Sequence, residues 1–241
     1  MKNKMFSGWR KFIKCYISGM HCFYCGRLAT NGDLCAECRG KLQYFAASGR
    51  SLCPGCGGYN DGILEYCSRC LEVESRPWRG AAALFALDSF AEGFIYRMKG
   101  GNGIDLTYEF GRELADLVLK QNFEVDVVVP IPLHWRRWWR RGFNQSEIIS
   151  EAVAGALNKP CVNYLRRRRM AVKQHFLGRK ARWRNLADAF APSWRGRREL
   201  RGKRILLVDD VLTTGATLHH AALALIDGGA AAVYIGVIGR R

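Results

Sequence analysis

The C-terminal two thirds of the chain alternates between two spacings of apolar residues. Nearly continuous apolar runs predict buried strands, and segments with apolar residues three and four positions apart predict amphipathic helices. The predicted strands span 81–87, 125–131, 162–165, 205–209 and 232–238. The predicted helices span 88–98, 105–121, 145–157 and 217–227. This alternation predicts an α/β fold in which helices flank both faces of a mostly parallel sheet.

The N-terminal third is built differently. Apolar residues such as Phe6, Trp9 and Ile13 recur at helical spacing, which predicts an N-terminal amphipathic helix over residues 1–19. This helix either docks on the rest of the protein or lies on a membrane surface. Residues 20–75 contain few aliphatic side chains but many cysteines, which predicts a small module stabilised by metal. Residues 76–241 form the α/β domain.

Length and hydrophobicity limit the class of protein. With 241 residues, 49% of them hydrophobic, the chain is long enough for one medium-sized domain and a small one. No run approaches the roughly 18 apolar residues that a transmembrane helix needs. Lys11 and Lys14 interrupt the apolar residues near the start, so no signal peptide is predicted. The expected compartment is therefore the cytoplasm.

Positive charge is concentrated in one part of the chain. The net charge is +17, and residues 133–204 contain 20 Lys or Arg but only 4 Asp or Glu. Such a field attracts polyanions, either a nucleic acid such as single-stranded DNA or a substrate with a diphosphate group. The alternative is a charged surface that only keeps the protein in solution.

Eight of the ten cysteines form Cys-x-x-Cys pairs. The pairs are Cys22/Cys25, Cys35/Cys38, Cys53/Cys56 and Cys67/Cys70. Two such pairs supply the four thiolates of a tetrahedral site, so the spacing predicts one or two structural Zn²⁺ ions. In a reducing compartment, metal binding is favoured over disulfides. The sequence leaves open whether the pairs combine in chain order or interleave.

Residues 205–217 carry the most specific chemical pattern in the chain. An apolar strand leads to Asp209 and Asp210, and a helix is predicted to begin near Thr217. The loop between them contains Thr213, Thr214, Gly215, Ala216 and Thr217. Ligands of parallel sheets bind at the carboxyl ends of strands, where these loop amides would hold a phosphate group. The two acids can accept hydrogen bonds from ribose hydroxyls or hold Mg²⁺.

This motif resembles the signature with which type I phosphoribosyltransferases bind phosphoribosyl diphosphate (PRPP). Three further segments extend the resemblance to the ComF family. They are Pro-x-Pro-Leu-His from Pro130, Arg-Arg-Gly-Phe-Asn-Gln from Arg140, and Gln-x-x-Leu-x-Arg-x-x-Arg-x-x-Asn from Gln174. Members of that family also carry Cys-x-x-Cys pairs before the transferase domain. The turn at Lys99 is a weaker match, and a solvated helix end is its alternative explanation.

The resemblance implies a type I phosphoribosyltransferase fold preceded by a small zinc-ribbon-like domain, and binding of PRPP with Mg²⁺. Loop 213–217 would hold the 5′-phosphate, and Asp209 and Asp210 would hold the ribose. Arg140 and Arg141, followed by Gly142, would neutralise the diphosphate. The segment that contains Gln174, Arg179, Arg182 and Asn185 is predicted to be a flexible loop that closes over the substrate.

Three functions are compatible with these residues and with the resemblance to the ComF family, which implies a role in natural competence and the handling of single-stranded DNA. The first is transfer of the phosphoribosyl group to an unidentified acceptor, in natural competence or DNA uptake. The second is a non-catalytic factor that binds single-stranded DNA and competence-machinery proteins, with tryptophans of 135–141 as stacking surfaces. The third is a zinc-ribbon adaptor with a vestigial transferase domain. The intact acid pair and loop favour the first.

Overall fold

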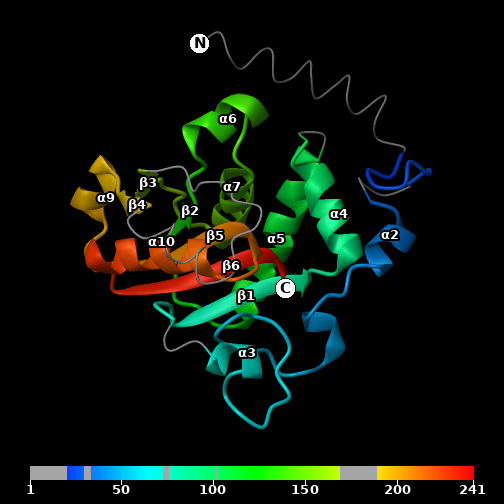
Figure 1. Ribbon diagram of the computed structural model, residues 1–241, viewed down its shortest axis with the longest axis horizontal. Helices are drawn as coiled ribbons and strands as arrows, with labels where there is room; N and C mark the ends of the chain where they lie inside the picture. Colours follow the sequence, from blue (N-terminus) through cyan, green and yellow to red (C-terminus); the bar gives the residue numbers. More distant parts are fainter. Residues whose placement is uncertain (1–20, 30–33, 73–75, 101–102, 169–188) are drawn as a thin grey trace.

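A four-stranded parallel sheet lies at the centre of the molecule (Figure 1). The computed structural model describes residues 21–29, 34–72, 76–100, 103–168 and 189–241. The strands, in spatial order, are β1 (Gly80–Ala86), β6 (Ala232–Arg240), β5 (Arg204–Leu212) and β2 (Val127–Pro130). All neighbouring pairs run parallel, which confirms the predicted mostly parallel sheet. The N-terminal helix predicted over 1–19 lies outside the described residues.

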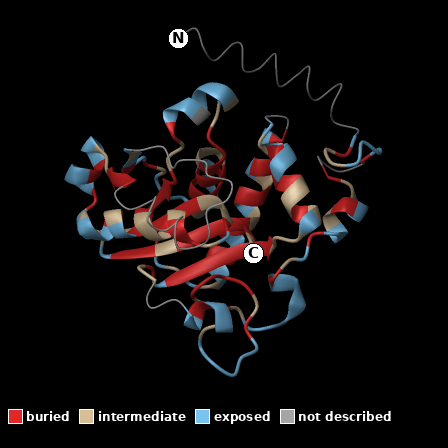
Figure 2. Ribbon diagram, viewed as in Figure 1, coloured by how far each residue is buried: buried red, intermediate tan, exposed pale blue. Residues whose placement is uncertain are grey.

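Helices cover both faces of the sheet, as the sequence predicts. One face packs against α4 (Ser89–Met98), α5 (Ile104–Lys120) and α7 (Gln145–Leu157), and the other packs against α10 (Ala216–Asp227). Successive strand residues belong to opposite cores: Leu206 and Val208 face α5, whereas Leu207 lies in the core with α10. The strands are therefore buried on both sides, as Figure 2 shows.

Two predictions about smaller elements are wrong. The predicted helices do not include the segment after β2, but residues Trp135–Arg141 form a helix, α6. The His134 side chain accepts a hydrogen bond from Arg136 N at its start, and Gly142 ends it with a φ of 77°. The strand expected at 162–165 lies instead at Leu165–Arg167 (β3) and pairs antiparallel with β4 (Phe190–Pro192). A short helix, α9 (Trp194–Glu199), follows β4.

The cysteine module wraps around the outer edge of β1. It contains α2 (Ala36–Gly40), a 3₁₀ turn η1 (Ala46–Ser48) and α3 (Ser68–Leu71). Between the two halves of the module, Phe45 N donates to Leu84 O at 2.9 Å, and Ala86 N donates to Gln43 O at 2.9 Å. These bonds cover a strand edge that would otherwise expose unpaired backbone groups. The two halves therefore pack on opposite faces of the sheet.

Across the described ranges, no helix combines the length and apolarity needed to cross a membrane. The longer helices α4, α5, α7 and α10 have buried and exposed sides, which Figure 2 distinguishes.

Candidate functional site

The acid pair, Asp209 and Asp210, lies on β5 just beyond the point where the neighbouring strand β2 ends. β5 continues to Leu212, because β6 runs beside it as far as the pairing of Leu212 with Arg240. The prediction that the strand ends at residue 209 is therefore wrong by three residues. On the other side, β2 ends with Pro130 opposite Val208. Asp209 and Asp210 thus follow directly after the end of the neighbouring strand, at the carboxyl edge of the sheet.

Asp209 is held by two hydrogen bonds to one carboxylate oxygen. Ser146 Oγ donates to Asp209 Oδ1 at 2.8 Å, and Asp210 N donates to the same atom at 2.9 Å. Burial of the carboxyl group raises the pKa of Asp209 to about 7, and the neighbouring Asp210 carboxylate adds to this rise. The bond from Ser146 opposes it. Asp209 can therefore change its protonation state near neutral pH.

Asp210 of β5 forms an ion pair with a lysine at the end of α4. Lys99 Nζ lies 2.5 Å from Asp210 Oδ2, and the two side chains are only 24% and 15% exposed. Lys99 is the C-cap of α4, where a cation is favoured by the helix dipole. The alternative explanation of Lys99 as a solvated helix end is therefore wrong. Lys99 balances the charge of Asp210, whereas Asp209 is stabilised by its two hydrogen bonds.

The loop after β5 ends in a helix N-terminus without a side-chain cap. Helix α10 begins at Ala216, one residue before the predicted start, and Gly215 caps it with a φ of 79°. Glycine adopts this left-handed conformation without strain. Just before the cap, Thr214 Oγ1 accepts a hydrogen bond from Ala216 N at 3.5 Å. The amides that follow it in the first turn, including that of Thr217, receive no side-chain cap from Gly215 and are available to an anion.

The predicted diphosphate-binding arginines lie at the end of α6, the helix that follows β2. β2 is adjacent to β5, and α6 follows β2, so Arg140 and Arg141 are on the same side of the sheet as the acid pair. No hydrogen bond or ion pair joins these two arginines to the acids among the described residues. Helix α6 projects from the top of the molecule in Figure 1. Gly142 ends it before the chain turns into α7.

Ser146 was not predicted to belong to the site, and Asn144 was predicted only as part of a family motif. Ser146 lies in the first turn of α7, which Asn144 caps by accepting a hydrogen bond from Ser146 N at 3.3 Å. Asn144 also donates to Ile131 O at 3.0 Å, so this turn is fixed to the end of β2. A serine just after a recognised motif was the only signal for this role.

The predicted flexible-loop residues Gln174, Arg179, Arg182 and Asn185 lie outside the described residues.

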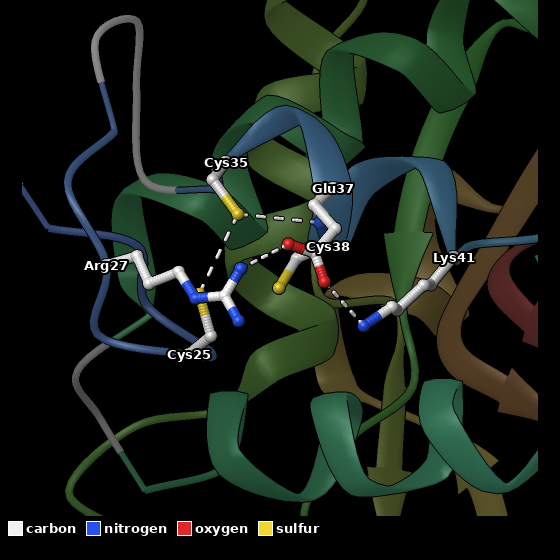
Figure 3. Close-up of polar contacts among 6 residues, drawn as sticks. All are labelled: Cys25, Arg27, Cys35, Glu37, Cys38 and Lys41. Atoms are coloured by element: carbon white, nitrogen blue, oxygen red, sulfur yellow. Dashed lines mark hydrogen bonds and ion pairs between the residues drawn. The ribbon is translucent and has the colours of Figure 1, made fainter.

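The first cysteine cluster lies on the face of the sheet that α4 and α5 cover. It contains Cys22, Cys25, Cys35 and Cys38. Figure 3 shows the thiols of Cys25 and Cys35 directed toward each other, with Sγ atoms 3.7 Å apart. Cys38 N donates to Cys35 Sγ at 3.5 Å, and Glu37 pairs with Arg27 and Lys41 beside it. Arg39 joins α2 to Glu109 and Glu113 of α5.

The second cysteine cluster lies on the opposite face, in the core that contains α10. It contains Cys53, Cys56, Cys67 and Cys70. Cys56 Sγ lies 3.8 Å from Cys67 Sγ, and Cys67 N donates to Cys53 Sγ at 3.3 Å. Hydrogen bonds from Cys56 and Cys70 lower the pKa of the Cys53 thiol. Arg240 Nη2 lies 3.9 Å from Cys67 Sγ, so a guanidinium from β6 also faces the sulfurs.

The geometry of both clusters fits a tetrahedral metal site. Within each, the four Sγ atoms lie within 4.8 Å of one another. Zn–S bonds of about 2.3 Å in a tetrahedron place sulfurs roughly 3.8 Å apart, close to the 3.7 Å between Cys25 and Cys35 and the 3.8 Å between Cys56 and Cys67. A disulfide instead requires an S–S distance of about 2.05 Å. The pairs combine in chain order, which decides between the two arrangements that the sequence leaves open. Both clusters can hold a metal ion.

A parallel sheet with an acid pair on β5, followed by a small-residue loop into α10, defines the type I phosphoribosyltransferase fold. The family model for the phosphoribosyl transferase domain matches residues 166–241. The chain is 32% identical over 192 residues to DNA utilization protein YhgH of Escherichia coli K12, covering 77% of this chain and 82% of that protein. It is 30% identical to competence protein F of Haemophilus influenzae, covering 86% and 89%. The chain belongs to the ComF family.

One solved structure with similarity to the fold is glutamine PRPP amidotransferase of B. subtilis complexed with ADP and GMP. It is 22% identical with a TM-score of 0.38, covering 54% of this chain and 25% of that chain.

Proposed function

We propose that the protein binds PRPP with Mg²⁺ and transfers its phosphoribosyl group to an acceptor. The observation that carries this proposal is the meeting of an acid pair with an uncapped helix N-terminus at the carboxyl edge of a parallel sheet. The acids suit the hydroxyls of a sugar, and the amides of loop 213–217 suit its phosphate group. The names of the relatives support a role in the use of DNA that a competent cell takes up.

Each group has a separate task in this proposal. The amides and hydroxyls of Thr213, Thr214 and Thr217, with the backbone of Gly215 and Ala216, hold the 5′-phosphate. Asp209 and Asp210 hold the ribose hydroxyls, and Ser146 fixes the orientation of Asp209. Arg140 and Arg141, at the end of α6 before Gly142, neutralise the diphosphate when the substrate is bound.

The transfer needs no nucleophile from the protein. The bond between the anomeric carbon and the diphosphate oxygen breaks, pyrophosphate leaves with the electron pair, and a nucleophilic acceptor forms the new bond and loses a proton. Positive charge develops on the ribose ring while negative charge develops on the leaving group. Catalysis therefore consists of positioning and charge stabilisation by fixed groups.

The donor set fits Mg²⁺. Carboxylate oxygens are ligands that this ion prefers, and Asp209 and Asp210 offer two carboxylates beside the expected diphosphate. When bound with PRPP, Mg²⁺ supplies Lewis-acid stabilisation of the diphosphate. The four thiols of each cysteine cluster fit Zn²⁺ in the same sense, and we propose that both clusters hold structural zinc.

Ligand-dependent thermal stability tests the binding step. We expect PRPP to raise the Tm of the zinc-loaded protein in the presence of Mg²⁺, and to raise it far less without Mg²⁺. The double variant Asp209→Asn with Asp210→Asn keeps the shape of both side chains and should lose this shift. An unchanged shift in the double variant would contradict the assignment of the acids. Release of pyrophosphate from radiolabelled PRPP, screened over bases and amines, then tests the transfer step.

The exposed face of α6 favours a second candidate function, which is binding of single-stranded DNA. Trp135, Trp138 and Trp139 are 60%, 46% and 77% exposed on a helix that is otherwise arginine-rich. Exposed aromatic rings between cations are typical of surfaces on which bases stack. Replacement of Trp138 and Trp139 by alanine should weaken oligo-dT binding, and binding should fall steeply with salt. Absence of binding at low salt would remove this candidate.

A further inference from the structure

Arg76 belongs to the segment that connects the second cysteine cluster to β1. Its guanidinium carbon lies 5.1 Å from the centre of the Trp78 ring. Trp78 is buried, and its Nε1 donates to Gly55 O at 2.9 Å, inside the Cys53/Cys56 turn. Stacking on a ring that is itself fixed to the cluster limits where the guanidinium can lie.

The guanidinium of Arg76 is adjacent to loop 213–217, called the phosphate loop below. A Cβ atom added at Gly215 would lie 3.3 Å from Arg76 Nη1 and 3.8 Å from the Trp78 ring. Burial lowers the pKa of His219, in the first turn of α10, and the charges of His220 and Arg76 lower it further. The distance from Gly215 places the Arg76 cation beside the N-terminus of α10, and its effect on the pKa of His219 agrees with that position.

A cation in this position opposes the helix dipole. The N-terminus of α10 carries partial positive charge, so an arginine there is unfavourable in the absence of an anion. Among the described residues, Arg76 takes part in no ion pair, and its buried Nε has no acceptor. The N-cap residue of α10, Gly215, has no side chain that could accept hydrogen bonds from the first-turn amides. The Arg76 guanidinium and the first-turn amides of α10 therefore lie close together, and no anionic group among the described residues is paired with the guanidinium.

We propose that Arg76 binds the 5′-phosphate of PRPP together with the amides of loop 213–217. A phosphate monoester supplies the negative charge and the several acceptor oxygens that the guanidinium and the amides require. The arginine comes from outside the β5–α10 motif, in the segment between the cysteine module and β1, and Trp78 connects it to the second cluster. This inference rests on the proposed function, because it assigns a further residue to the same site.

Binding measurements with three probes test the role of Arg76. The variant Arg76→Gln is compared with Arg79→Gln, which removes an exposed arginine three residues away. By calorimetry, Arg76→Gln should weaken binding of ribose 5-phosphate, and of PRPP with Mg²⁺, by roughly 10- to 100-fold. Binding of pyrophosphate with Mg²⁺ should not change, since that probe lacks the 5′-phosphate. Arg79→Gln should match the wild type with all three.

Different outcomes separate this inference from the proposed function. If the wild type binds neither sugar phosphate, the proposed function fails. If the wild type binds both and Arg76→Gln binds them equally well, only the role of Arg76 fails. Equal losses for pyrophosphate and ribose 5-phosphate would also overturn it, because a general distortion would then explain the effect.

A measurement on the wild type covers the case in which Arg76→Gln does not fold. The guanidinium Nε–H signal of Arg76 is assigned by its absence in Arg76→Lys, which keeps the charge. Ribose 5-phosphate should shift this signal and slow its exchange with water, whereas pyrophosphate with Mg²⁺ should leave it unchanged. A signal that does not respond to ribose 5-phosphate at saturation would overturn the inference.

Discussion

The two cysteine clusters have the same ligands and similar spacing, but they occupy different environments. In the first cluster Cys25 is exposed, and the surrounding contacts are ion pairs from α2 to the helix layer. In the second cluster Cys53 and Cys56 are each only 1% exposed, and Arg240 of β6 faces the sulfurs. The second cluster is therefore part of a core that the sheet and α10 share, whereas the first joins the core of α4 and α5 through Cys22 and Cys38 and leaves Cys25 exposed.

This difference teaches that a repeated sequence motif need not have a repeated role. Both halves of the module bring four thiols together, but only the second half reaches the phosphate loop, through Trp78 and Arg76. We therefore expect the first cluster to affect stability alone. The second should affect both stability and substrate binding.

Removal of one ligand from each cluster gives the largest contrast. Cys56→Ser places a hydroxyl group in a buried site that water cannot reach, and it should lower the free energy of unfolding by about 4 kcal/mol or more. For a chain of this length the fall in Tm is roughly 8–16 °C, measured by scanning calorimetry. Cys25 is exposed, so water can replace the ligand that Cys25→Ser removes. The fall in Tm of this variant should be less than half as large. Equal falls would contradict the comparison.

The guanidinium beside the second cluster should affect metal affinity at that cluster alone. Arg240→Met removes a cation that faces thiolates, and we expect about 10- to 100-fold weaker zinc binding at one of two sites. Competition with a chromogenic chelator measures both sites. The matched variant Arg39→Met loosens α2 from α5 but contacts no cysteine sulfur, so zinc release should be unchanged. Weaker binding at both sites in Arg240→Met would count against separate environments.

The acid pair should respond to pH independently of both clusters. The pKa of Asp209 is raised to about 7, so affinity for PRPP with Mg²⁺ should fall about tenfold from pH 8 to pH 6 as this carboxylate gains a proton. Asp209→Asn should bind weakly and lose this part of the pH dependence. Asp126→Asn should keep it, because Arg204 lowers the pKa of Asp126 to about 2, far below this range.

The raised pKa of Asp209 makes the stability of the ligand-free protein change with pH in the opposite direction to the affinity for PRPP. Between about pH 4 and pH 7 folded Asp209 retains a proton that the unfolded chain has released. Stability should therefore decrease as the pH rises through this window. Denaturant unfolding at several pH values, compared with Asp209→Asn, measures this contribution. A contribution that increases with pH would contradict the raised pKa.

The smallest effect is expected from the surface ion pairs of the first cluster. Glu37→Gln removes the pairs with Arg27 and Lys41, all of which are exposed to solvent (Figure 3). Since such pairs contribute little, Tm should remain within about 2 °C of the wild type, and PRPP affinity should not change. A loss of PRPP affinity would show that the first cluster also supports the substrate site.

The sequence was sufficient for the parts of the fold that depend on local patterns. Continuous apolar runs predicted β1, β2, β5 and β6, since strands covered on both faces contain few polar residues. The end of β5 could not be predicted, because its last three residues depend on the length of β6 beside it. Helix α6 was missed because tryptophans and arginines without a buried stripe give no helical period, although its capping residues were present in the sequence.

The site was predictable where a motif is contiguous and unpredictable where the fold assembles it. The acid pair and the phosphate loop are adjacent in the sequence, so strand and helix geometry alone brings them together. Lys99 and Ser146 meet these acids only because α4 and α7 pack on the same face of the sheet. Likewise, the order in which the cysteine pairs combine depends on the path of the module around β1.

The position of Trp78 makes it an optical reporter for two events. Its indole lies between the second cluster and the phosphate loop, whereas Trp135, Trp139 and Trp194 are 60%, 77% and 72% exposed. Iodide quenches the emission of exposed indoles and spares a buried one. In iodide, the blue-shifted fluorescence that remains should therefore follow both the loading of the second cluster with zinc and the arrival of a sugar phosphate at Gly215.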